Sequence, residues 1–171
     1  VSGLVICDER NEGELDRLLA ESRIVILAGG HVPTQNAFFQ KIGLKERIND
    51  FEGTVMGISA GTMNCASVVY AQPELAGESK DPAYERFLTG LGLTDLMILP
   101  HYQEVKDNML DGKRLMEDIT YGDSRGRTFY ALVDGSYVVC QGGEEILHGE
   151  AYRIQNGMTE KICEQNGAIG L

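Results

Sequence analysis

Two short apolar segments constrain the fold of this chain more than any other feature. Residues 23–27 (RIVIL) are continuously apolar after the first position, and residues 54–58 (TVMGI) form a similar run. Each segment leads into a glycine-containing turn, and the stretch between them, residues 34–48, has apolar positions at helical spacing. Continuous apolar runs are typical of parallel strands that are covered on both faces. The alternation of strand and helix therefore predicts an α/β fold with a parallel sheet and right-handed crossovers.

Further elements are predicted around this unit, within a single domain that spans residues 1–171. Residues 71–89 are acidic and contain proline, which is typical of an excursion over the surface. Turn signals in the last third predict an antiparallel meander. The expected strands are 1–6, 96–99 and 128–133, with 137–140, 146–147 and 152–155 in the meander, and the expected helices are 9–21, 62–69 and 113–120.

Composition excludes several classes of function. The chain has 26 acidic and 15 basic residues and a formal charge of −11, which repels nucleic-acid phosphates and anionic lipid surfaces. No apolar run approaches the roughly 18 residues of a membrane span. The four cysteines are scattered, without a C-x-x-C pair or a histidine at ligand spacing, so neither a metal site nor a disulfide framework is expected. We expect a cytoplasmic protein without a nucleic-acid or membrane partner.

A candidate nucleophile lies where the second apolar segment ends. Residues 57–61 (GISAG) fit the pattern G-x-S-x-G, with an apolar strand before it and a helical pattern after it. The turn is so tight that glycine is needed on both sides of Ser59, and the hydroxyl is pushed outward. The backbone N–H groups that follow open a helix and can stabilise an oxyanion. We therefore interpret Ser59 as a nucleophile rather than as a helix cap.

A serine nucleophile needs a base, and the chain has three histidines. His101 follows an apolar strand in residues 96–102 (LMILPHY), and open α/β sheets bind their ligands at the carboxyl ends of strands. His148 lies between turn signals, and His31 lies in a glycine-rich loop where it could line the site. His101 is therefore the candidate base.

The third member should be a carboxylate that orients the imidazole and stabilises its charged form. Glu74, Glu78 and Asp81 lie between the serine and the histidine, and Glu104 and Asp134 follow the histidine. Sequence spacing alone does not choose among these five carboxylates.

A second oxyanion donor is expected from the loop after the first apolar segment, residues 28–31 (AGGH). Its glycines let the backbone approach a substrate carbonyl closely. A phosphate-binding loop is the rival interpretation, but neither G-x-G-x-x-G nor the Walker pattern is present.

These three motifs together resemble the dipeptidase E (aspartyl dipeptidase) and cyanophycinase family of serine peptidases. The resemblance rests on residues 26–30 (ILAGG), 57–61 (GISAG) and 99–102 (LPHY), and it covers about residues 23–140. It implies a three-layer sandwich similar to class I glutamine amidotransferases. It also implies Ser59 as nucleophile, His101 as base, and the N–H groups of Gly30 and Ala60 as the oxyanion hole, with no cofactor and no metal.

The resemblance further implies an acidic residue between the serine and the histidine, with Glu78 as the first choice and Glu74 as the second. The resemblance implies a short peptide as substrate, with Asp-X dipeptides as one candidate class. It implies a monomer or a homodimer. His31 replaces the usual asparagine of the family loop and is a candidate substrate contact. Arginines that would bind an acidic side chain cannot be matched, although Arg114, Lys113 or Lys106 could serve. The family has one more strand and helix before the segment that begins at Val1.

Two other functions fit the same motifs. A carboxylesterase would have the same order of serine, acid and histidine, although such enzymes need a longer chain. A non-catalytic relative could use the amidotransferase-like scaffold only to bind a small molecule or partner. A glutamine amidotransferase is disfavoured, because that chemistry uses cysteine at the position of Ser59.

Overall fold

The two apolar segments form a parallel strand pair, as predicted. In this computed structural model, which describes residues 3–171, β1 (Ile24–Leu27) pairs with β2 (Thr54–Gly57). The register runs from Ile24 opposite Thr54 to Leu27 opposite Gly57. Both strands therefore end at the same edge, where the glycine-rich loop and the G-x-S-x-G turn lie next to each other.

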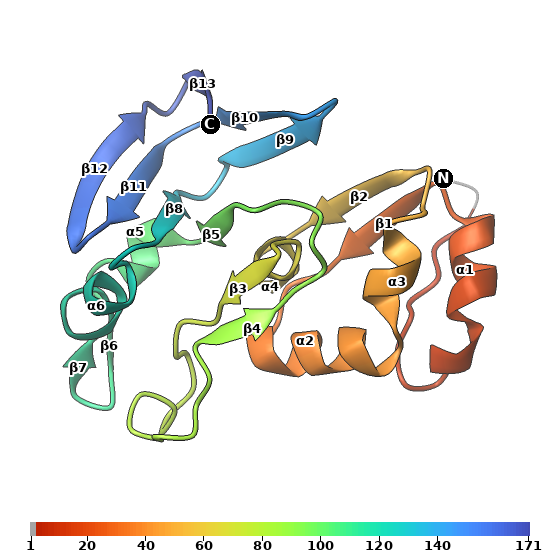
Figure 1. Cartoon of the computed structure of the whole chain (residues 1–171), viewed down its shortest axis with the longest axis horizontal. Helices are drawn as coiled ribbons and strands as arrows, with labels where there is room; N and C mark the ends of the chain where they lie inside the picture. The colour runs from red at the N-terminus through yellow and green to blue at the C-terminus, as the bar shows by residue number, and fades with distance from the viewer. Residues whose placement is uncertain (1–2) are drawn as a thin grey trace.

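Three helices pack on one face of this pair (Figure 1). They are α1 (Leu15–Glu21), α2 (Val32–Lys41) and α3 (Leu44–Ile48), and a short 3₁₀ turn over Glu12–Glu14 precedes the first. The single helix predicted over 34–48 is divided at Gly43, whose φ of 61° lies in the left-handed region and ends α2. Strand side chains alternate in direction. Those of Val25 and Leu27 pack toward the helices, whereas Ile24, Ile26, Met56 and Ile58 remain 48–53% exposed.

A second, four-stranded sheet carries the rest of the fold. Its order is β12-β11-β8-β5, and β5 (Met97–Leu99) pairs in parallel with β8 (Thr128–Leu132). β11 (Ala151–Gln155) and β12 (Met158–Cys163) add antiparallel strands. The fold is therefore mixed α/β with parallel pairs, as expected. A separate three-stranded sheet contains β9 (Tyr137–Gln141), β10 (Glu144–His148) and β13 (Ala168–Gly170), in the order β13-β10-β9.

The prediction of a helix over residues 62–69 is wrong beyond Asn64. Helix α4 (Ala60–Asn64) stops there, and the chain enters β3 (Val68–Tyr70), which pairs with β4 (Phe87–Thr89). The backbone groups that would continue the helix bond instead to residues 90–94, including Asn64 O with Leu91 N and Ser67 N with Thr94 O. Residues 71–86 are thus the connection between two paired strands.

Two other predictions also differ from the structure. In place of a helix over 113–120, a short pair of β6 (Met109–Leu110) and β7 (Lys113–Arg114) leads into a π-helical turn over Leu115–Thr120 and then α6 (Tyr121–Asp123). The strand expected at 1–6 is not formed at residues 3–6, and residues 1–2 lie outside the described part. Within residues 3–171, no helix has both the length and the apolar character needed to cross a membrane.

Candidate active site

The turn after β2 holds Ser59 in a strained backbone conformation. Its φ of 53° and ψ of −117° lie in a backbone region that residues other than glycine rarely adopt. The flanking glycines are required sterically, because a Cβ on Gly57 would lie 2.6 Å from Thr62 Cα and one on Gly61 would lie 1.9 Å from Leu27 O. Both contacts are with backbone atoms and cannot be relieved by side-chain movement. The sequence therefore fits the turn that presents the Ser59 hydroxyl.

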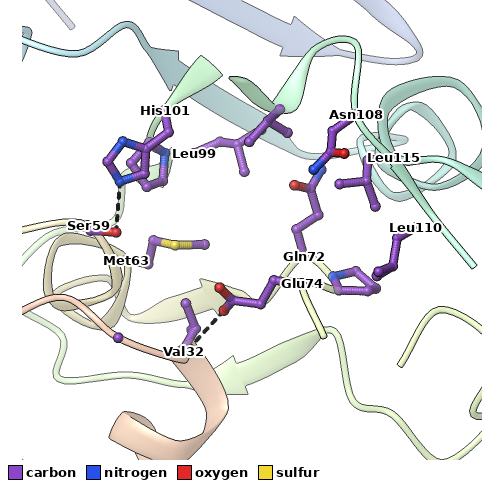
Figure 2. A pocket seen from close by; sticks show the side chains of 14 residues that line it. Val32, Ser59, Met63, Gln72, Glu74, Leu99, His101, Asn108, Leu110 and Leu115 are labelled. Carbon is purple, nitrogen blue, oxygen red and sulfur yellow. Dashed lines mark hydrogen bonds between the residues drawn. The ribbon is translucent and has the colours of Figure 1, made fainter. Parts of the chain in front are cut away.

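His101 reaches this hydroxyl from the end of the other parallel pair. It follows β5 by two residues and caps α5 (Tyr102–Val105), with a left-handed φ of 57°. Its Nε2 lies 2.9 Å from Ser59 Oγ (Figure 2). The structure thus brings together the two residues that the sequence selected as nucleophile and base.

Asp134 holds the other side of the imidazole. Its Oδ1 lies 2.7 Å from His101 Nδ1, and its backbone N–H donates to Gln103 Oε1 at 3.1 Å. A carboxylate only accepts hydrogen bonds, so the contact favours the tautomer with the proton on Nδ1. Nε2 is then free to accept the Ser59 proton. The Asp134 side chain is 55% exposed, so water screens part of its charge.

The expectation that Glu78 or Glu74 would orient His101 is therefore corrected. The Glu78 carboxylate lies 2.7 Å from His31 Nε2 and accepts the backbone N–H groups of Glu74 and Leu75, both at 2.9 Å. Burial raises the pKa of Glu78, but these backbone donors and His31 outweigh it, so its pKa is lowered overall. Glu74 Oε1 accepts the backbone N–H of Val32 at 3.1 Å.

The two acids bond their segment to the loop after β1 and to the start of α2, whereas the hydrogen-bond partners of His101 are Ser59 and Asp134. Asp134 was among the five carboxylates left open by spacing. A signal in the sequence could have selected it: like His101, it follows the end of a strand by two residues, and those strands are parallel neighbours.

The loop expected to supply an oxyanion donor lies against the nucleophile. A Cβ on Gly29 would contact Ser59 Cβ at 3.4 Å, and Gly30 has a φ of 144°. Gln35 Nε2 donates to Ala28 O at 2.6 Å and holds the loop to α2. Within residues 3–171, neither Gly30 N nor Ala60 N has an assigned hydrogen-bond acceptor, whereas Gly61 N is bonded to Ile58 O.

A pocket of about 130 Å³ opens next to the serine and histidine. The reactive pair lies at one end, and amide and apolar side chains form the opposite wall (Figure 2). Glu74 is the acidic residue of the lining. The other lining residues are Gly30, Val32, Met63, Gln72, Pro73, Leu99, Pro100, Val105, Asn108, Leu110 and Leu115.

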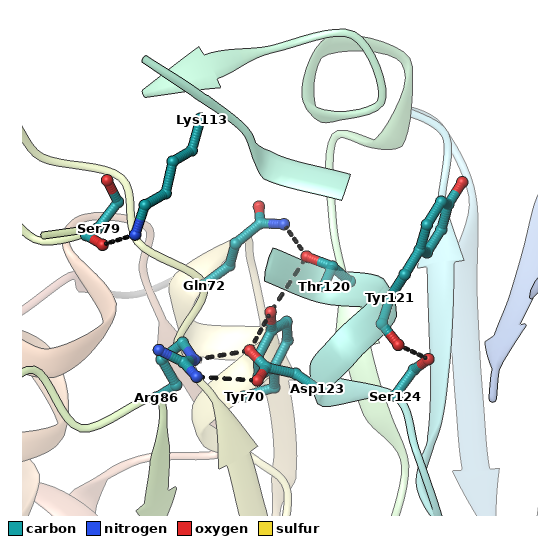
Figure 3. Close-up of polar contacts among 9 residues, drawn as sticks. All are labelled: Tyr70, Gln72, Ser79, Arg86, Lys113, Thr120, Tyr121, Asp123 and Ser124. Carbon is teal, nitrogen blue, oxygen red and sulfur yellow. Dashed lines mark hydrogen bonds and ion pairs between the residues drawn. The ribbon is translucent and has the colours of Figure 1, made fainter. Parts of the chain in front are cut away.

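A hydrogen-bond chain, exposed at Arg86 and buried at Thr120, orients the amide of Gln72 in this wall (Figure 3). Arg86 donates to both carboxylate oxygens of Asp123, at 2.7 and 3.0 Å, and Tyr70 OH donates to Asp123 Oδ2 at 3.0 Å. Because the tyrosine proton is thereby used, the Thr120 hydroxyl donates to Tyr70 Oη at 3.1 Å. Thr120 Oγ1 then accepts Gln72 Nε2 at 2.6 Å. Burial is the main cause that raises the pKa of Tyr70, which stays protonated.

The predicted substrate contacts His31 and Arg114 do not line the pocket. His31 is held by Glu78 and by Thr34 Oγ1, at 2.7 and 2.8 Å, and Arg114 is paired with Asp118 at 3.2 Å. Lys113 donates to Ser79 O at 2.6 Å (Figure 3). Among the described residues, no group of three or more histidine, cysteine or acidic side chains could hold a metal ion.

The α/β fold and the aligned serine, histidine and aspartate define a protein with the site arrangement of a serine hydrolase. The sequence matches peptidase family S51 over residues 2–148, and the chain belongs to that family. No curated protein sequence matches it. A crystal structure of a putative peptidase E protein from Listeria monocytogenes EGD-e is similar in fold, with a TM-score of 0.57 and 17% identity. The match covers 88% of this chain and 65% of that one, so this chain spans about two thirds of its neighbour's length.

Proposed function

We propose that this chain is a serine peptidase that hydrolyses short peptides through an acyl-enzyme on Ser59. The observation that carries the proposal is the unbroken contact from Ser59 Oγ to His101 Nε2, at 2.9 Å, and from His101 Nδ1 to Asp134, at 2.7 Å. A carboxylesterase could use the same three side chains, so the geometry alone does not separate the two functions. Membership of family S51 favours a peptidase. A non-catalytic relative would have no need of this alignment.

Acylation follows from the protonation states that the contacts favour. Ser59 Oγ attacks the carbonyl carbon of the scissile amide while His101 Nε2 takes the hydroxyl proton. Asp134 stabilises the imidazolium that forms. The N–H groups of Gly30 and Ala60 are the proposed donors to the oxyanion. His101 then donates the proton to the amide nitrogen, the carbon–nitrogen bond breaks, and the amine leaves with an ester on Ser59.

Deacylation repeats the same proton transfers with water. His101 removes a proton from water as its oxygen attacks the ester carbon. The proton then passes to Ser59 Oγ as the ester bond breaks, which releases the acid and restores the enzyme. Each proton that leaves a nucleophile is returned to a leaving group, so the cycle needs no cofactor.

We infer a three-layer sandwich of the class I glutamine amidotransferase type, followed by an antiparallel C-terminal segment. Support comes from the parallel pairs β1–β2 and β5–β8 and from the antiparallel hairpin of β9 and β10. The cytoplasm is the proposed compartment, which is consistent with four free thiols.

Fluorophosphonate labelling tests the proposal without knowledge of the substrate. An activated serine reacts with the probe, whereas an ordinary hydroxyl does not. We expect stoichiometric labelling that mass spectrometry places on Ser59 and that is lost in His101→Ala. Labelling at another serine, or no labelling of correctly folded protein, would refute the proposed function.

A further inference from the structure

Two buried asparagines lie where helices α2 and α4 meet, outside the pocket. Asn64, the last residue of α4, is 0% exposed, and Asn36, in α2, is 5% exposed. Neither residue lines the pocket beside Ser59. A buried polar side chain costs free energy unless its donors and acceptors are paired, so each of these amides needs specific partners.

The Asn64 side chain bonds to both segments that carry the proposed oxyanion donors. Its Nδ2 group donates to Ala60 O at 3.2 Å, to Gln35 Oε1 at 3.1 Å and to Val32 O at 3.4 Å. Gln35 Nε2 donates in turn to Ala28 O at 2.6 Å. The side-chain amides of Asn64 and Gln35 therefore hold backbone carbonyls of the loop after β1 and of the helix that follows the nucleophile.

These bonds bracket Gly30, which Ala28 precedes by two residues and Val32 follows by two. A Cβ on Gly30 would meet nothing within 4 Å, so packing around this residue does not fix its position. The hydrogen bonds of its neighbours do so instead. The acidic contacts described above join the loop to residues 74–78, whereas the Asn64 contact joins it to α4.

The direction of each amide is set by backbone carbonyls, which only accept hydrogen bonds. Gln35 Nε2 faces Ala28 O, so Gln35 Oε1 is the atom that faces Asn64. Asn36 Nδ2 donates to Thr89 O at 2.9 Å and to Asn64 Oδ1 at 2.8 Å, which leaves Asn64 Nδ2 for the remaining acceptors. The network thus has one consistent arrangement of donors and acceptors.

We propose that Asn64 is a positioning residue of the oxyanion hole, which acts through Gln35 to set the N–H of Gly30 relative to the N–H of Ala60. This inference rests on the proposed serine peptidase function. Donors stabilise an oxyanion when they lie about 2.7–3.1 Å from the place where it forms. Since the two donors belong to different segments, their separation depends on the contacts between those segments. A misplacement of about 1 Å can lower the rate about 10²-fold.

Gln35→Met tests the proposal without leaving a buried group unpaired. Methionine has a similar length and no donor, and Gln35 is only half-buried, so water can bond to the freed Ala28 carbonyl. Asn64 keeps its two backbone acceptors. Gln40→Met is the matched control, because Gln40 lies on the same helix and donates to the far side of the network, at Asn36 Oδ1 and 2.7 Å.

The readouts are the hydrolysis of p-nitrophenyl butyrate and the affinity of propyl trifluoromethyl ketone, which has the same acyl group. The ketone forms a hemiketal: Ser59 Oγ bonds to the carbonyl carbon, the hydroxyl proton passes to His101, and the carbonyl oxygen becomes an oxyanion. Fluorophosphonate titration gives the concentration of active enzyme. A loss of folded protein lowers that concentration but leaves the Ki of the remaining enzyme unchanged.

We expect Gln35→Met to lower kcat about tenfold with less than a roughly twofold change in KM, because the oxyanion is absent from the bound substrate. The Ki of the ketone should rise by the same factor as kcat/KM falls. Gln40→Met should change both by less than about twofold. Asn64→Ala should lower kcat about 10- to 100-fold. Addition of Gln35→Met to Asn64→Ala should cost less than the product of the two single losses, because the two side chains act together.

Other results would refute this role. A fall in kcat with an unchanged Ki of the ketone, or equal effects of Gln35→Met and Gln40→Met, would assign the network a structural role and overturn the proposal. Losses that multiply in the double variant would overturn the action of Asn64 through Gln35. In each case labelling of Ser59 in the unaltered protein would leave the proposed function standing, whereas absence of that labelling would overturn both proposals.

Discussion

Asp134→Asn removes the charge that holds His101 and also alters its tautomer. An asparagine NH₂ group facing Nδ1 favours the proton on Nε2, and that nitrogen then cannot take the Ser59 proton. In serine proteases with a Ser-His-Asp triad, the same change in the buried aspartate lowers kcat about 10⁴-fold. Here the aspartate side chain is 55% exposed, so water already screens part of the electrostatic contribution, whereas the tautomer effect is unchanged.

We therefore expect a loss of about 10²- to 10⁴-fold in kcat, with little change in KM. The assay is the initial rate of hydrolysis of a short-peptide p-nitroanilide, alongside the rate of fluorophosphonate labelling, which should fall in parallel. Thermal unfolding should be nearly unchanged, because substitution of an exposed side chain usually alters stability by less than about 0.5 kcal/mol.

Glu78→Gln is the informative comparison, because the carboxylate of Glu78 contacts His31 rather than His101. It should lower the labelling rate far less than Asp134→Asn. If Asp134→Asn keeps full labelling while Glu78→Gln loses it, the assignment of the third member is refuted.

Three further predictions concern the turn at Ser59 and the carboxylate of Glu78. Ser59→Gly removes the hydroxyl and relieves a backbone with φ 53°, so activity should vanish while the free energy of unfolding rises by about 1 kcal/mol, measured by urea denaturation; a fall in stability would contradict the strain. Gly61→Ala places a Cβ 1.9 Å from Leu27 O and should destabilise the protein by more than about 2 kcal/mol, whereas Gly122→Ala, with open space around it, should not. Because the pKa of Glu78 is lowered in the folded state, its carboxylate stabilises the fold above the unfolded pKa of about 4.3, and this stabilisation is lost as pH falls through the folded pKa. Glu78→Gln should therefore reduce the pH dependence of Tm between about pH 6 and 3. An unchanged profile of Tm against pH would contradict this.

The sequence by itself determined the parts of the site that depend on local structure. The apolar run of residues 54–58 followed by G-x-S-x-G specifies a strand, a tight turn and a helix start, because only glycine fits beside Ser59. The strand before His101 similarly places that residue at the carboxyl end of the sheet. Such features extend over a few consecutive residues, so their steric requirements can be inferred from the residue types alone.

The third member of the site and the pocket depended on tertiary structure. Asp134 meets His101 across 33 residues because β5 and β8 are parallel neighbours, and spacing could not distinguish it from four other carboxylates. The end of helix α4 was likewise decided by hydrogen bonds from residues 64–67 to residues 90–94, which override local helical preference. Which side chains line the pocket beside the nucleophile depends on how these distant segments pack.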